Sequence, residues 1–200
     1  MINLDPSRVI GKGYHRECYV HPKNKNFCIK IVVFGNFKES QREQKYYRLL
    51  QKRNTPWEIL PEFHGVVETN LGSGAVFDLI RDCDGNVSKT MEHYLMFADK
   101  LDVSVPDLLE AIDLLKINLF QHKIITMTLK PKNIVYEKLT PEKGRLIIID
   151  NIGNSDFIPF CNYNTFLARI KISRKWRKFE STYLASPDLR TNNSFKNPKR

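Results

Sequence analysis

Two polar side chains, Asn133 and Asp150, have the types and the spacing of a metal site. Asn133 ends the polar cluster 128–133, and Asp150 begins a second cluster with Asn151; each cluster borders a short β-branched run. Such runs are typical of buried strands, and loops at strand ends often display reactive side chains. If a hairpin joins the two strands, the amide and the carboxylate could hold a divalent cation between them. Oxygen ligands suit magnesium, which usually accompanies a phosphate.

A phosphate site would also need a backbone cradle and a cation, and residues 8–34 contain candidates for both. Gly11 and Gly13 frame a turn between two extended segments, where backbone N–H groups could approach phosphate oxygens closely. Lys30 lies inside the dense β-former run 27–33, so it would sit beneath that turn. Both features also have purely structural explanations. Glycine pairs mark many turns, and a lysine on a half-buried strand can extend to solvent.

The surrounding patterns predict the elements that would position these residues. Extended segments within 8–34 predict a small antiparallel sheet, which strands at 63–67 and 75–80 would continue. Residues 81–86 break regular structure and could form a hinge between two lobes. Helical patterns occur at residues 37–53, 89–101, 106–123 and 165–184.

The helix predicted at 37–53 carries the acidic candidates for a partner of Lys30. Glu39 and Glu43 are one turn apart, so either could reach inward to a strand lysine or instead pair with a basic residue on the helix surface. The apolar stripe of this helix comprises Phe37, Tyr46, Leu49 and Leu50.

The composition favours a globular protein with anionic partners. The 200 residues include 32 Lys and Arg against 22 Asp and Glu, a formal net charge of +10. Nucleotides, nucleic acids, acidic proteins and anionic membranes all fit this charge. The four cysteines form no Cys-x-x-Cys pair, which argues against a disulfide framework or a zinc site. With no signal-peptide pattern and no apolar run of about 18 residues, we expect a cytoplasmic protein.

The order of these features resembles that of the protein-kinase fold over about residues 8–160. A glycine turn, a strand lysine, a helix glutamate, a Lys-Pro-Lys-Asn loop and an Ile-Asp-Asn-Ile-Gly loop follow one another. The resemblance implies an α+β fold with an antiparallel-sheet N-lobe, residues 1–84, and a reduced, mostly helical C-lobe, residues 85–185. Residues 186–200 are polar and are predicted to be a disordered tail.

The resemblance also implies roles for the N-lobe candidates. Gly11 and Gly13 match the first two glycines of the loop that covers ATP phosphates, and Arg16 stands where the third would be. Lys30 matches the lysine that pairs with the phosphates and with a helix glutamate. Glu43 is the better match for that glutamate, and Glu39 is the second candidate.

In the C-lobe the resemblance assigns magnesium to Asn133 and Asp150 and places Lys130 in the catalytic loop. The catalytic aspartate should directly precede Leu129, but Thr128 occupies that position. A hydroxyl cannot accept a substrate proton as a carboxylate does, and general-base assistance typically contributes about 10²–10⁴-fold.

Two further departures concern the base and the substrate. Asp156 or Glu137 could replace the missing base if the fold brings either of them close. No long activation segment and no Ala-Pro-Glu motif follow Asp150. An active enzyme would therefore act on a small molecule, on itself or on a partner that supplies its own docking surface.

Five segments narrow the resemblance to one family. They closely resemble the YrbL family, small bacterial kinase-like proteins named for the PhoP regulatory network. This resemblance implies a bacterial protein connected to PhoP-type regulation, without implying one particular activity. The five segments are residues 14–22, 28–32, 63–69, 126–134 and 150–153.

Three functions are compatible with these observations. The first is an ATP- and magnesium-dependent phosphotransferase, and the second is a pseudokinase that senses nucleotide or acts as a scaffold for a regulatory protein partner. The third is a basic module that contacts nucleic acid or anionic lipid through residues 169–178. The simpler interpretation of that segment is a solvated helix with Ile170 and Trp176 in the core, so the nucleotide is the main expected partner.

Overall fold

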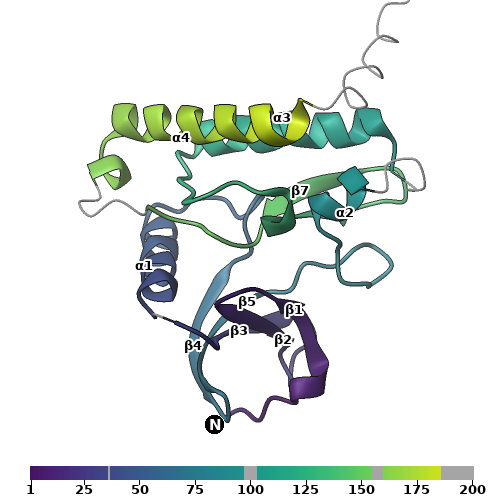
Figure 1. The fold of residues 1–200 in the computed structure, drawn as a ribbon, viewed down its shortest axis with the longest axis vertical. Coiled ribbons are helices and arrows are strands. Elements are labelled where there is room, and N and C mark those ends of the chain that lie inside the picture. Colours follow the sequence, from purple (N-terminus) through teal and green to yellow (C-terminus); the bar gives the residue numbers. More distant parts are fainter. Residues whose placement is uncertain (36, 97–102, 155–159, 186–200) are drawn as a thin grey trace, which may run out of the picture.

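Figure 1 shows a β-sheet at one end of the molecule and a pair of helices at the other. The structure is a computed structural model that describes residues 1–35, 37–96, 103–154 and 160–185. The predicted tail at 186–200 therefore lies outside the described residues, as does the end of the helix predicted at 89–101.

The sheet has five strands, and every neighbouring pair is antiparallel. A 3₁₀ turn, η1 (Pro6–Arg8), precedes it. In spatial order the strands are β1 (Val9–Lys12), β2 (Arg16–Val20), β3 (Phe27–Val32), β5 (Gly72–Asp78) and β4 (Phe63–Thr69).

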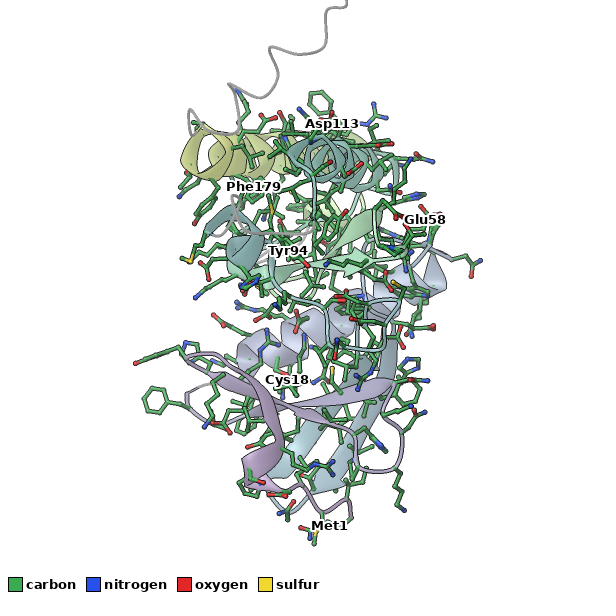
Figure 2. The ribbon with its side chains drawn as sticks, turned by 90° about the vertical axis from the view of Figure 1, so that its right-hand side faces the viewer. Met1, Cys18, Glu58, Tyr94, Asp113 and Phe179 are labelled. Carbon is green, nitrogen blue, oxygen red and sulfur yellow. The ribbon has the colours of Figure 1, made fainter. Side chains whose placement is uncertain are left out.

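The alternation of side chains along β3 determines which way its lysine points. Ile29 and Ile31 are buried on one face of the sheet, in a small cluster with Leu4, Tyr19 and Val76. Because successive residues of a strand face opposite sides, Cys28 and Lys30 lie on the other face. Cys28 belongs to the main core, and Figure 2 places Cys18 of β2 near α1 (Lys38–Lys52).

The helix α1 buries the stripe expected of it, with one exception. Tyr46 and Leu50 are buried and Leu49 packs against the core, but Phe37 is 56% exposed. Phe37 is the cap residue that precedes the first turn, so it lies beyond the surface that the stripe covers. Of the two glutamates, Glu39 is exposed and Glu43 is buried.

The rest of the chain forms a hairpin covered by helices. The helix α3 (Val105–Gln121) begins with Ser104 as its cap, whose Oγ accepts from the Asp107 N–H at 3.2 Å, as the sequence predicted. The helices α3 and α4 (Thr165–Phe179) lie side by side in Figures 1 and 2. The elements are α2 (Met91–Met96), α3 (Val105–Gln121), η3 (Pro131–Asn133), β6 (Ile134–Lys138), β7 (Gly144–Ile148), η4 (Phe160–Asn162), α4 (Thr165–Phe179) and the π-helical turn η5 (Glu180–Leu184).

One apolar core joins the sheet, α1 and the helical part. Its buried members include Phe77 from β5, Tyr47 from α1, Leu119 from α3 and Trp176 from α4. The segment that contains Asn133 and Asp150 passes through this core, because Ile134 and Ile148 are both completely buried in it. None of the described helices combines the length and the apolar character needed to cross a bilayer.

Candidate functional site

The turn after β7 holds Asp150 in a fixed position. Asn151 adopts a positive φ of 62°, and its N–H donates to Asp150 Oδ1 at 2.7 Å. The Asn151 carbonyl accepts from the Met127 N–H at 2.8 Å, and the Gly153 N–H donates to the Ile125 carbonyl at 2.9 Å. These bonds fasten the turn to the segment that leads into the predicted catalytic loop.

Asn133 lies beside this turn. It ends η3, and its backbone carbonyl accepts from the Ile149 N–H at 2.9 Å, one residue before Asp150. The side-chain nitrogen of Asn133 is buried without a hydrogen-bond partner among the described residues. Buried polar groups normally have partners, so this amide is a candidate for contact with a ligand.

Arg16 connects α1 to Asp150 across the space between the sheet and the hairpin. Its guanidinium forms one ion pair with Glu43 and another with Asp150. The exposed fractions of the three side chains are 17% for Arg16, 2% for Glu43 and 34% for Asp150. Arg16 therefore places one positive charge between a buried carboxylate and a partly exposed one.

Lys30 points into the same space but does not pair with Glu43. Its ammonium donates to the Ile149 carbonyl and lies 4.6 Å from the centroid of the Phe77 ring. Glu43 accepts instead from Arg16 and, at 3.2 Å, from the Ile152 N–H. The lysine–glutamate pair that the kinase resemblance implies is thus replaced by an arginine–glutamate pair.

Gly11 and Gly13 lie on the chain that leads to Arg16. Gly11 pairs with Cys18 within β1 and β2, and the Gly13 N–H donates to the Arg16 carbonyl at 2.8 Å. His15, which follows this turn, contacts the Tyr14 ring edge-on, and its Nδ1 lies 3.1 Å from the Phe34 carbonyl oxygen.

Thr128 and Lys130 are exposed in the loop before η3. Beside Thr128, the Lys175 ammonium donates to the Met127 carbonyl, so a cation approaches the position where a kinase has its base. Glu137, one proposed replacement, belongs to β6 and pairs with Arg145 at 2.5 Å. Asp156, the other, lies outside the described residues.

Tyr46 ties α1 to the segment that carries the site. Its hydroxyl accepts from the Ile125 N–H at 2.8 Å and donates to the Lys123 carbonyl at 3.3 Å. Burial raises the pKa of Tyr46 to about 12, although the Ile125 N–H and the charge of Arg53 act in the opposite direction. The hydroxyl therefore stays protonated and serves as a structural link.

The basic helix α4 differs from its simplest interpretation. Trp176 is buried as expected, but Ile170 is half exposed beside Arg169 and Arg174. Ile170 is two residues from both Ala168 and Ile172, which are buried, and two residues along a helix correspond to opposite sides. Lys171 is buried and donates to Asn154 Oδ1.

The site therefore brings together Arg16, Glu43, Lys30, Asn133 and Asp150 around the end of β7. From the sequence, Arg16 was expected only to stand in place of the third glycine, with no role of its own. The signal in the sequence was a basic residue in the glycine turn of a chain whose other site candidates include two carboxylates, Glu43 and Asp150. No group of three or more His, Cys, Asp or Glu side chains that could hold a metal occurs in the described part of the chain.

A solved structure supports the fold. A chain in the structure of the CAK complex from Chaetomium thermophilum bound to ATP-γ-S matches with a TM-score of 0.54 and 15% sequence identity. The match covers 72% of this chain and 45% of that chain, so this protein spans less than half of the chain it resembles. The likeness confirms the predicted α+β, protein-kinase-like fold and says nothing about activity.

Sequence comparisons identify the family. The family described as PhoP regulatory network protein YrbL matches residues 2–184. The YrbL proteins of Escherichia coli (strain K12) and Shigella flexneri are each 36% identical to this chain over 192 residues, which cover 94% of this chain and 89% of theirs. The chain belongs to the YrbL family of PhoP regulatory network proteins.

Proposed function

We propose that this protein binds the phosphates of ATP between its sheet and the β6–β7 hairpin and acts as a kinase-like regulatory module. The observation that carries the proposal is the convergence of two cations, Arg16 and Lys30, on the turn around Asp150. Two cations close together favour a phosphorylated ligand. The fold and the glycine turn support a nucleotide as that ligand.

The arginine gives this site an internal counter-charge. Without nucleotide, Arg16 pairs with both Glu43 and Asp150. Phosphate oxygens accept strongly from a guanidinium, so a bound nucleotide would compete with both carboxylates for Arg16. The loop of Gly11 and Gly13 ends at Arg16, and a change of partner by Arg16 would move that loop with it.

Asn133 and Asp150 fit a magnesium ion that accompanies the nucleotide. Both offer oxygen atoms, which magnesium prefers, and the bond from the Ile149 N–H to the Asn133 carbonyl holds the two residues close together. When bound, the ion would neutralise phosphate charge. Asp150 can bind the ion only when Arg16 shares or releases the Asp150 carboxylate, because the guanidinium contacts Asp150 Oδ1.

Regulation is favoured over efficient phosphate transfer by the surroundings of Thr128. A hydroxyl replaces the carboxylate, and the nearby Lys175 ammonium adds positive charge where a base would have to collect a proton. The loss of base assistance is worth about 10²–10⁴-fold in rate. A nucleotide-dependent change of the Arg16 contacts would instead report ATP to a protein partner.

A slow phosphotransferase is the second candidate. It is favoured by the retention of Asn133 and Asp150 beside each other, joined through Ile149. Positioning and charge neutralisation supply most of the catalysis in phosphoryl transfer, and these two residues could serve both.

Calorimetric titration with ATP, in magnesium and in EDTA, tests the binding. We expect Lys30→Ala and Asp150→Ala to weaken binding at least tenfold. Lys45→Ala, which removes an exposed lysine of α1, should leave the affinity unchanged. The absence of any nucleotide binding in either condition would overturn the proposal.

A parallel assay of γ-phosphate transfer separates the two candidates. Binding without transfer selects the regulatory module, and transfer by the unmodified protein selects the phosphotransferase. A gain of transfer in Thr128→Asp would show that the base alone was missing.

A further inference from the structure

A cavity of about 420 Å³ lies where the end of α1, the end of α3 and the start of α4 meet. The start of α4 and α1 lie on the same side of the molecule in Figure 1. The volume is in the range of small-molecule sites. None of Arg16, Lys30, Asn133 and Asp150 lines this cavity, so it is separate from the nucleotide site proposed above.

The charges of the wall suit an anion. Two basic side chains line the wall, Arg53, which caps α1, and Lys123, in the turn after α3, and His122 directly precedes Lys123. The thirteen described residues that line the cavity include no Asp or Glu. Two basic side chains without an acidic one among them attract negative charge.

The start of α4 belongs to the same wall, although its cap already accepts from one of the free N–H groups. Asn164 caps the helix, and its Oδ1 accepts from the Leu167 N–H at 3.0 Å. Thr165, the first residue of the helix, also lines the cavity. The first N–H groups of an α-helix have no partner within the helix, and the helix dipole at this end favours an anion.

A buried acceptor suggests what else the ligand carries. The Oδ1 atom of Asn162 is buried and has no hydrogen-bond partner in the described part of the chain. Asn162 lines the cavity, together with the polar residues Asn54 and Thr55. An unpaired acceptor in a cavity that also contains cationic donors fits a ligand that has hydroxyl groups as well as an anionic group.

We propose that this cavity is a second binding site, for a small phosphorylated molecule that bears hydroxyl groups and has the size of a monosaccharide phosphate. Arg53, Lys123 and the first turn of α4 hold the phosphate, and Asn162 accepts from a hydroxyl. The ligand is an effector, because its site includes Arg53, which caps the helix α1 that carries Glu43, and the turn before Ile125, which Tyr46 connects to α1. Only this effector role rests on the proposed nucleotide function.

Titration with inorganic phosphate, glucose 6-phosphate and glucose, followed by calorimetry and by the shift in Tm, tests the site. We expect glucose 6-phosphate to bind more tightly than inorganic phosphate, and glucose not to bind. The double variant Arg53→Gln/Lys123→Gln should weaken glucose 6-phosphate binding at least tenfold. The matched control Lys45→Gln/Lys143→Gln removes the same charge at exposed positions outside the cavity and should bind like the unmodified protein.

Two further variants keep the outcome decisive. Asn162→Asp, which places a carboxylate in the wall, should abolish phosphate binding even if the double variant is poorly folded. Lys30→Ala should leave glucose 6-phosphate binding unchanged, whereas an equal loss in Lys30→Ala would locate the anion in the nucleotide site and overturn the proposal. Equal weakening by the matched control would overturn it as well, since binding would then follow net charge alone.

Discussion

Replacing Arg16 by alanine should destabilise the protein by about 3 kcal/mol, chiefly through the carboxylate left behind at Glu43. Removing one partner of a buried ion pair costs about 3–5 kcal/mol, whereas an exposed pair contributes about 0–1 kcal/mol. Glu43, with 2% of its side chain exposed, belongs to the first class, and Asp150, at 34%, is closer to the second. The Ile152 N–H still donates to Glu43 at 3.2 Å, which places the expected cost near the lower bound.

Urea denaturation of a double-mutant cycle with Glu43→Gln measures this dependence. The neutral amide needs no counter-charge, and its oxygen can still accept from the Ile152 N–H. We expect the double variant to recover about 2 kcal/mol of the Arg16→Ala cost, inside the range of about 0.5–3 kcal/mol for contacting residues. At about 2–4 °C per kcal/mol, a loss of about 3 kcal/mol lowers Tm by roughly 6–12 °C.

The control is Arg42→Ala, which removes an exposed arginine from α1 and should change stability by less than about 0.5 kcal/mol. A coupling free energy below about 0.5 kcal/mol between Arg16 and Glu43 would refute the reasoning. Glu43 would then be stabilised by something other than the guanidinium.

Three further predictions concern the link between α1 and the Asp150 turn. Tyr46→Phe should cost about 1–3 kcal/mol in urea denaturation, because the Ile125 N–H loses its buried acceptor. Gly153→Ala should destabilise by at least about 1 kcal/mol, since its φ is 118° and a Cβ would lie 3.3 Å from Tyr46 Cβ. Gly85→Ala is the control in the same assay, because Gly85 also has a positive φ, 85°, but has open space around it. The difference between the two variants therefore measures the contact with Tyr46 apart from the backbone strain. Stability should fall as pH rises from 10 towards 12, because the unfolded Tyr46 has a pKa of 10.0 and the folded one about 12, so the unfolded state loses its proton first. A pH series of denaturation midpoints should show a smaller fall in Tyr46→Phe.

Elements with strong local signals were predictable from the sequence. The Ser104 cap and the apolar spacing indicated α3, and the β-former run around Lys30 indicated β3. Phe37 and Ile170 were placed in apolar stripes because periodicity shows only that a residue shares a helix with apolar neighbours. Tertiary packing decides which side of a helix is covered by another element. In this fold it leaves the side chains of Phe37 and Ile170 at the surface.

The candidate site was predictable in composition but not in its contacts. Glu43 was the better match on its sequence pattern, and the structure places it inside while Glu39 stays exposed. The role of Arg16 depends on partners 27 and 134 positions away in the chain. Contacts over such separations follow from how the sheet, α1 and the hairpin pack together, and no local spacing encodes them.

The core shared by the two lobes limits how this molecule can move. Tyr46 of α1 is buried, and its hydroxyl bonds to the Ile125 N–H and the Lys123 carbonyl, so separating the lobes would expose this side chain and break both bonds. Burying an aromatic side chain is worth about 1.5–3 kcal/mol, and a buried hydrogen bond about 0.5–1.5 kcal/mol. Wide opening would therefore cost several of the roughly 5–15 kcal/mol that stabilise a typical domain. Ligand entry and signalling must instead use small changes such as a new partner for Arg16, which leave the core intact.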